Sequence, residues 1–147
     1  MSYAENKKAW HDYEIIESFE AGIVLEGHEV KAIRSGKISI LGSYVQIIYN
    51  EAFLIGATIA PYQPKNTPKN YDPEKNRKLL LNKKEIASLI GKVKERGLTI
   101  VPLKVYDKKG KIKLEIGLAK AKKKYDKRTS IRKKEEKRKI ERVLKQY

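Results

Sequence analysis

Residues 98–118 read LTIVPLKVYDKKGKIKLEIGL, and this stretch decides the fold of the chain. Apolar and polar side chains alternate over 98–106 and again over 111–118, which is the period of a β-strand with one buried face. Between the two runs, Asp107-Lys108-Lys109-Gly110 has the composition of a β-turn. Pro102 predicts an edge or a bulge in the first run, because proline cannot donate a ladder hydrogen bond. The stretch therefore predicts an antiparallel hairpin.

Two shorter segments near the N-terminus extend this β pattern. Residues 13–19 are rich in β-forming side chains and predict a strand, which we expect to continue over 23–25 beyond a bulge at Gly22. Residues 27–34 have apolar side chains at helical spacing and are followed by Gly36, so they predict one or two helical turns.

The middle of the chain predicts a second hairpin and a long loop. Residues 43–49 and 52–59 are apolar, β-rich runs, and the dipeptide Asn50-Glu51 between them predicts a tight turn. Residues 61–76 contain four prolines among polar side chains, which is typical of an irregular surface loop.

One true helix follows this loop. Asn82 can cap its first turn, with Glu85 at the position that completes a capping box. Gly97 supplies the stop. We expect residues 77–82 to lead into this helix. Its apolar stripe is predicted to consist of Ile86, Leu89, Ile90 and Val93.

The predicted fold is mainly β with helices. About five or six antiparallel strands, interrupted by one helix, fit a small closed β-barrel of OB-like character. We expect residues 13–118 to form this barrel, after an N-terminal segment over residues 1–12. A basic C-terminal tail over residues 119–147 is predicted to be disordered or helical.

Composition and charge narrow the function. The chain has 147 residues, enough for one domain, and it has no cysteine, which excludes disulfides and cysteine zinc sites. We expect a soluble cytoplasmic protein, since no signal peptide and no run of roughly 20 apolar residues is present. The 34 Lys and Arg residues exceed the 18 Asp and Glu residues, a net charge of +16. Nucleic acid is the natural partner for such a surplus, ahead of a membrane surface or an acidic protein.

The tail carries most of this charge. Residues 119–147 hold 14 basic and 4 acidic side chains, a net charge of +10, whereas residues 1–118 have a net charge of +6. Four apolar side chains near the end share one helical face: Ile140, Val143, Leu144 and Tyr147. Charged side-chain pairs at i,i+4 stabilise a helix by only about 0.2–0.5 kcal/mol each, which is too little to hold an isolated helix. We therefore expect the tail to order only when it binds a partner.

Catalytic motifs are not evident. The two histidines, His11 and His28, lie near carboxylates, but neither has the spacing of a metal site, and no phosphate-binding glycine loop is present. We therefore expect a protein that binds rather than catalyses, without a metal or other cofactor. A nuclease that uses His11 and nearby carboxylates is the enzymatic alternative.

Aromatic side chains favour an RNA partner. Tyrosines scattered among basic residues can stack on bases, although they can equally pack in a barrel. Tyr125 lies among five Lys and Arg side chains and has no core-like neighbours in sequence. Arg77 and Lys78 precede the predicted helix and could receive a phosphate there, or simply lead into the helix.

A series of short motifs makes the sequence specific. In order, they are Asn6-Lys7-Lys8-Ala9, His11-Asp12-Tyr13, Glu20-Ala21-Gly22-Ile23, Gly27-His28-Glu29-Val30-Lys31, Arg77 to Asn82, Val101-Pro102-Leu103-Lys104 and Tyr125-Asp126-Lys127-Arg128. This ordered set closely resembles the SsrA-binding protein family, also called small protein B. The resemblance runs from about Asn6 into the tail.

The resemblance implies an OB-like barrel that binds transfer-messenger RNA (tmRNA) and delivers it to stalled ribosomes for trans-translation. In that family the body grips the tRNA-like domain of the RNA, and the tail enters the decoding centre and mRNA channel, against small-subunit rRNA. Alanyl-tRNA synthetase and the elongation factor that carries aminoacyl-tRNA would be partners through the RNA. No membrane partner is implied. The alternative is a generic OB-type RNA-binding or ribosomal protein without rescue activity.

The resemblance implies most of the contact residues by their positions in the motifs, and local charge adds the rest. In the body the predicted RNA-binding residues are Asn6, Lys7, His11, Tyr13, Glu20, Tyr44, Arg77, Lys78, Leu80, Asn82 and Lys113. In the tail the predicted ribosome-binding residues are Lys120, Lys122, Lys123, Tyr125, Asp126, Lys127, Arg128, Val143 and Leu144. Ala121 stands where the family commonly has Gly, and it would be strained if that position required positive φ.

Overall fold

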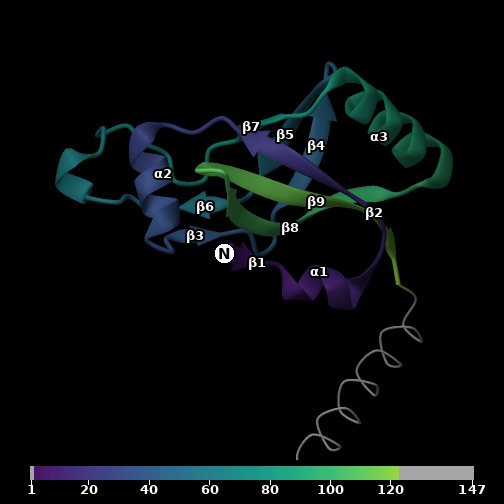
Figure 1. The fold of residues 1–147 in the computed structure, drawn as a ribbon, viewed down its shortest axis with the longest axis horizontal. Helices are drawn as coiled ribbons and strands as arrows, with labels where there is room; N and C mark the ends of the chain where they lie inside the picture. Colours follow the sequence, from purple (N-terminus) through teal and green to yellow (C-terminus); the bar gives the residue numbers. More distant parts are fainter. Residues whose placement is uncertain (1, 123–147) are drawn as a thin grey trace, which may run out of the picture.

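The computed structural model describes residues 2–122 (Figure 1). The predictions for the tail beyond Lys122, including Lys123, Tyr125 to Arg128, Val143 and Leu144, lie outside the described residues. Within the described range no helix is long and apolar enough to span a membrane.

The described chain is mainly antiparallel β-sheet with three α-helices. The strands are β1 (Ser2–Glu5), β2 (Tyr13–Ile23), β3 (Ile38–Ser39), β4 (Tyr44–Ile48), β5 (Glu51–Ile55), β6 (Thr58–Ile59), β7 (Arg77–Leu80), β8 (Thr99–Lys108) and β9 (Lys111–Ala121). The helices are α1 (Lys7–Asp12), α2 (Gly27–Arg34) and α3 (Lys83–Arg96), with a short 3-10 turn at Pro64–Asn66.

One large sheet organises the molecule. Its seven strands follow the order β1-β8-β9-β2-β7-β5-β4, and β3 pairs with β6 in a separate small sheet. Every ladder is antiparallel. Figure 1 shows α2 and the loop that follows β6 at one end of the molecule and α3 at the other.

The predicted barrel closure is not shown. Within residues 2–122, the edge strand β4 forms a ladder only with β5, and β1 only with β8. The open edge of β4 lies beside the start of β8, and Thr99 and Ile100 of β8 line a hollow together with Val45 and Ile47 of β4 and with side chains of α3, but no ladder joins the two strands.

The hairpin predicted over residues 98–118 is confirmed. Lys109 and Gly110 both have positive φ (52° and 79°), which matches the twist of a tight two-residue hairpin turn. The register shifts between Pro102 and Lys104, so the bulge predicted at the proline is present. The second strand of the hairpin continues to Ala121, which pairs with Tyr13.

Strand β2 differs from the prediction. It is one strand through Gly22, and the irregularity lies between Ile15 and Glu17. Glycine at position 22 has a packing reason. A Cβ built there would lie 3.3 Å from the Cβ of Leu80 on the neighbouring strand β7.

The second hairpin is confirmed, with a different turn and a shorter second strand. Tyr49 and Asn50 form the turn with φ of 49° and 62°, one residue earlier than predicted. Gly56, with φ of 84°, ends this strand at Ile55, and the rest of the run becomes β6.

Helix α3 is confirmed with its caps. The Asn82 Oδ1 accepts from the Glu85 N–H at 2.8 Å, the Glu85 carboxylate accepts from the Asn82 N–H at 3.1 Å, and Gly97 is left-handed. Residues 77–80 were expected to lead into the helix but form β7, because β2 and β5 flank them with open edges. Two N-terminal elements, β1 and α1, were also not predicted.

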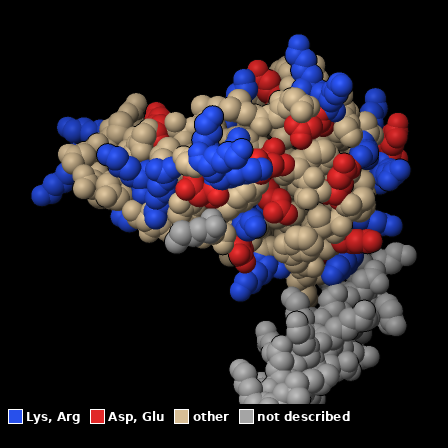
Figure 2. All heavy atoms as spheres, viewed as in Figure 1, with Lys and Arg blue, Asp and Glu red and all other residues tan. Residues whose placement is uncertain are grey.

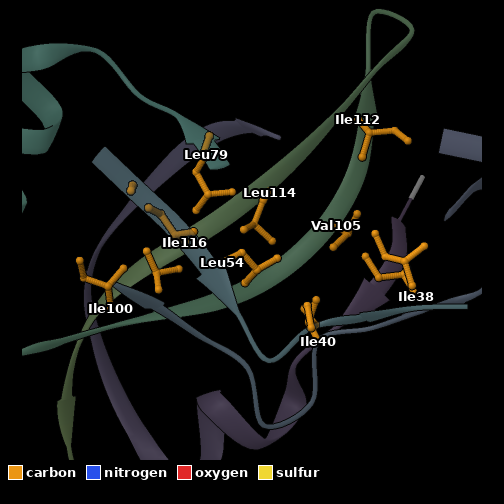
Figure 3. Close-up of a cluster of buried hydrophobic side chains, with 14 of the residues drawn as sticks. Ile38, Ile40, Leu54, Leu79, Ile100, Val105, Ile112, Leu114 and Ile116 are labelled. Carbon is orange, nitrogen blue, oxygen red and sulfur yellow. The ribbon is translucent and has the colours of Figure 1, made fainter. Parts of the chain in front are cut away.

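The core lies between the inner face of the large sheet and the elements that cross it (Figure 3). Val105, Leu114 and Ile116 are fully buried, as their alternation with polar residues predicts. Leu89 is the fully buried member of the α3 stripe. Both long strands therefore present their alternate, polar side chains outward.

Candidate nucleic-acid interface

The outward side of the large sheet brings together residues that are distant in sequence. The register aligns Leu80 with Gly22, Gly22 with Lys113, and Lys113 with Tyr106, in a row across β7, β2, β9 and β8. Glu20 lies two residues before Gly22 and thus shares this face. We call Glu20, Leu80, Tyr106, Lys108 and Lys113 the outward face; three of these residues were predicted RNA contacts.

A hydrogen-bonded group lies at the centre of this face. The Tyr106 hydroxyl donates to Glu20 Oε2 at 2.5 Å, and the Lys108 ammonium lies 3.1 and 3.3 Å from the two Glu20 oxygens. We call Glu20, Tyr106 and Lys108 the outer cluster. Tyr106 and then Lys108 lower the pKa of Glu20, whereas burial and the Glu20 carboxylate raise the pKa of Tyr106. At neutral pH the cluster holds an ionised carboxylate and a protonated hydroxyl.

Further cations and an aromatic side chain border the outward face. The Lys104 ammonium lies 5.1 Å from the centre of the Tyr106 ring. Lys104 also lines a shallow hollow with Lys7 and Trp10. Trp10 is 51% exposed. Figure 2 shows Lys and Arg side chains over the region where Figure 1 places the ends of β8 and β9, with acidic side chains beside them.

A second group of predicted residues surrounds a different hollow. Asn6, Tyr13 and Tyr44 line it, and Tyr44 is exposed. Asn6 itself is buried. Its Oδ1 accepts from the Ala9 N–H at 3.2 Å and caps α1, while its Nδ2 donates to the Pro102 carbonyl at 2.9 Å. The Asn6 side chain therefore has a structural role, and the tyrosines are the accessible members of this group.

His11 precedes Asp12, which lines this hollow, and the two side chains form a pair. Its Nδ1 is 2.9 Å from Asp12 Oδ1, and both side chains are partly exposed. Over residues 2–122, no group of three or more His, Cys, Asp or Glu side chains could hold a metal ion.

Arg77 requires a correction, because the structure places this predicted RNA contact inside the protein. Its side chain is 1% exposed, and its Nε donates to Glu29 Oε2 at 2.9 Å. The remaining guanidinium donors reach the carbonyls of Ala57, Lys75 and Pro73 and the hydroxyl of Tyr71. All five donors of the guanidinium are thus used. In this conformation Arg77 cannot contact RNA.

The partners of Arg77 complete a second acid–tyrosine–cation group, Glu29, Tyr71 and Arg77, which we call the inner cluster. The Tyr71 hydroxyl donates to the Ile59 carbonyl at 2.8 Å and lies 3.2 Å from Glu29 Oε2. Burial opposes ionisation of Glu29, but the Glu26 N–H and Arg77 outweigh it and hold the pKa of Glu29 below its usual range. The cluster ties α2 to β7 and to the long loop.

The other predicted residues of this region are at the surface. Lys78 is exposed and lies 3.5 Å from Glu51, and Leu80 is 54% exposed on the outward face. Asn82 is exposed while it caps α3. The cap is thus observed, and an RNA contact by Asn82 stays a prediction.

The body ends beside α1. Lys120 is exposed at the end of β9, and the Lys122 ammonium donates to the Trp10 carbonyl at 3.2 Å. Ala121 lies in the strand and is not among the residues with positive φ, so alanine there is not strained. The described chain therefore ends at the side of the sheet that carries α1.

Sequence reasoning did not select four residues of this surface: Trp10, Lys104, Tyr106 and Lys108. A signal for Trp10 was available, because it is the single tryptophan of the chain and has lysines near it in sequence. For Lys104 and Tyr106 the missing information was the strand register.

An antiparallel β protein whose accessible surface combines tyrosine, tryptophan and lysine side chains has the features of the small RNA-binding β proteins. Comparison with known proteins gives the particular family. The family model described as "SmpB protein" matches residues 3–146, and the chain belongs to this family. The resemblance predicted from the motifs is thereby confirmed.

Comparison with individual proteins supports the same family. The chain is 56% identical to the SsrA-binding protein of Sulfurihydrogenibium sp. (strain YO3AOP1), over 97% of this chain and 93% of the relative. It is 52% identical to the SsrA-binding protein of Persephonella marina, with the same coverage. Among solved structures it resembles a chain in "tmRNA-SmpB: a journey to the center of the bacterial ribosome", with a TM-score of 0.66 and 46% identity over 87% of this chain and 93% of that chain.

Proposed function

We propose that this protein binds the tRNA-like domain of transfer-messenger RNA and delivers it to stalled ribosomes for trans-translation. The observation that carries the proposal is the family match over residues 3–146, which includes both the body and the basic tail. The similar solved chain comes from a tmRNA-SmpB complex of the bacterial ribosome. We infer that tmRNA and the ribosome are also the partners of this chain.

The outward face suits the RNA-binding step. Lys113 and its neighbours supply cations for phosphates, and Tyr106 and Leu80 offer flat or apolar surface to bases and riboses. Glu20 differs from these, since a carboxylate accepts hydrogen bonds from base N–H groups or a ribose 2′-OH. A surface that combines these chemistries can recognise a folded RNA rather than only attract a polyanion.

The tail suits the ribosome-binding step. Residues 119–147 have a net charge of +10, which favours a channel lined with rRNA phosphates. We assign Lys120, Lys122, Lys123, Tyr125, Asp126, Lys127 and Arg128 to the decoding centre, and Val143 and Leu144 to the helix that forms beyond it. In this role the protein is a cytoplasmic binding factor without catalysis, and alanyl-tRNA synthetase and the elongation factor meet it through the RNA.

The test is direct binding of the full chain to an isolated tRNA-like domain and to a scrambled RNA of equal length. Replacing Lys113 with Ala should weaken binding to the tRNA-like domain about tenfold or more and lower the salt dependence of binding. Lys94→Ala on α3 removes an exposed lysine far from the outward face and is the matched control. Equal affinity of the wild type for both RNAs would reject the proposal in favour of generic RNA binding. Cleavage of either RNA in magnesium would favour the nuclease.

A further inference from the structure

The outer cluster poses a physical problem, since it places an acidic side chain in the middle of a surface for a polyanion. Glu20 is an ionised carboxylate, and a phosphate brought next to it would be repelled. Its two oxygens are held from one side by two donors of β8, the Tyr106 hydroxyl and the Lys108 ammonium. Both donors reach Glu20 across the intervening strand β9.

This arrangement leaves the carboxylate with a defined acceptor direction. An ionised carboxylate offers about four lone-pair positions, and the donors of β8 do not occupy all of them. Because the side chain is fixed, the remaining positions point the same way each time a partner approaches, and less side-chain entropy is lost on binding. A fixed acceptor selects for N–H and O–H donors and against phosphate oxygens.

We propose that Tyr106 and Lys108 are positioning residues that fix the Glu20 carboxylate to accept hydrogen bonds from base N–H groups or ribose 2′-OH groups of the bound RNA. The proposal rests on the proposed function and adds the residues and ligand chemistry that give the outward face its selectivity. Tyr106 is itself held in place, since Lys104 lies over its ring and β9 pairs with its backbone.

The protonation states of Glu20 and Tyr106 agree with their roles as hydrogen-bond acceptor and donor. Tyr106 and Lys108 keep the pKa of Glu20 below its ordinary value, so Glu20 is an acceptor at neutral pH. Burial and Glu20 raise the pKa of Tyr106, so its hydroxyl remains a donor. Lys113 and Glu115 are the other charged groups acting on this pair.

The test compares Tyr106→Phe, which removes only the hydroxyl, with Glu20→Gln and with the double variant. We expect Tyr106→Phe to weaken binding of the tRNA-like domain by about fivefold to tenfold, the size of one ordinary hydrogen bond. In the Glu20→Gln background the same change should have a much smaller effect, because the charged acceptor that Tyr106 positions is replaced by a neutral amide. Tyr62→Phe, which alters a tyrosine in the loop after β6 that is not part of the outer cluster, is the matched control.

Two readouts separate positioning from general damage. Carbon-13 NMR titration of the Glu20 carboxyl should show its pKa rising in Tyr106→Phe and unchanged in Tyr62→Phe. The slope of log affinity against log salt should stay at the wild-type value in Tyr106→Phe, since no phosphate contact is lost, and should fall in Lys113→Ala.

The outcomes are distinguishable. If the wild type does not prefer the tRNA-like domain to the scrambled RNA, the proposed function fails, and this proposal with it. If the wild type does prefer it, but Tyr106→Phe binds normally or its effect adds fully to that of Glu20→Gln, only the positioning role is overturned. An altered salt slope in Tyr106→Phe would also overturn it, by showing that the cluster acts on phosphates.

Discussion

The inner and outer clusters are built from the same three kinds of group, a glutamate, a tyrosine and a cation, yet they serve different purposes. In the inner cluster, Arg77 and Glu29 are almost completely buried, and every guanidinium donor is satisfied within the protein. In the outer cluster, Glu20 and Lys108 are solvent-accessible and retain unused hydrogen-bonding positions. The first can only hold the fold together, whereas the second can also bind a partner.

The comparison teaches how little the local sequence says about the role of a charged residue. Arg77 and Lys78 are adjacent cations that looked equally suited to a phosphate. On strand β7 their side chains point to opposite faces, so that one is buried and the other exposed. We therefore expect changes to buried residues to lower the free energy of unfolding, and changes to exposed residues of the outward face to weaken RNA binding.

The largest expected effect is on stability, from Arg77→Met. This change leaves Glu29 buried without its cation, which typically costs about 3–5 kcal/mol. The free energy of unfolding, measured by urea denaturation, should fall by that amount. Lys108→Met, the corresponding change in the outer cluster, should cost no more than about 1 kcal/mol, because exposed ion pairs contribute little.

If Arg77→Met does not fold, the free energy of unfolding is measured for the double variant Glu29→Gln/Arg77→Met instead. Removing both charges should restore part of the lost stability, since no unpaired carboxylate remains. Equal stability losses from Arg77→Met and Lys108→Met would contradict the distinction between the clusters.

The second-largest expected effect is the loss of stability from Leu79→Ala, which is compared with Leu80→Ala at the neighbouring position of β7. Leu79 is 2% exposed and Leu80 is 54% exposed. Leu79→Ala should therefore cost about 2–5 kcal/mol through the cavity it leaves. Leu80→Ala should change stability by less than about 0.5 kcal/mol, while weakening binding of the tRNA-like domain. Thermal unfolding and RNA titration of both variants check this, and a strongly destabilised Leu80→Ala would argue that the outward face is part of the core.

A smaller effect concerns Asn82, which was predicted both to cap α3 and to contact RNA. Asn82→Ala should cost about 0.5–2 kcal/mol, because the Glu85 N–H loses its acceptor. Asn82→Ser should retain the cap and most of this stability. If Asn82→Ser binds RNA as well as the wild type, the residue acts as a cap alone; weaker binding at unchanged stability would reveal the RNA contact.

The smallest expected effect is the pH dependence contributed by Glu29. Its pKa is lower in the folded protein than the ordinary value of 4.5, with burial opposing the shift and the Glu26 N–H and Arg77 producing it. Its contribution to stability is therefore fully present above pH 4.5 and is lost as the pH falls through the folded pKa. Urea midpoints between pH 7 and pH 3 should show a shallower acid decline in Glu29→Gln than in the wild type. Identical profiles would show that Glu29 is not held ionised by the inner cluster.

Local sequence signals were sufficient to predict several elements of secondary structure. The alternation over residues 98–118 predicted the hairpin and its bulge, and Asn82, Glu85 and Gly97 predicted both ends of α3. Such elements depend on contacts between residues close in sequence, which periodicity and capping report directly. The ordered motifs likewise predicted the family, and with it the function, without any knowledge of strand order.

Only the tertiary structure decided the openness of the sheet, the strand β7 and the separation of buried from accessible charges. Whether β4 forms a ladder with β8 or only lies beside it depends on contacts between distant segments, and alternation alone does not encode strand partners. Arg77 became a core residue because Glu29, 48 positions earlier, meets it across the fold. The row from Leu80 to Tyr106 exists only through the strand register. The sequence by itself thus determined the two hairpins, helix α3 and the family, while burial and register, both long-range properties, decided which side chains a partner can reach.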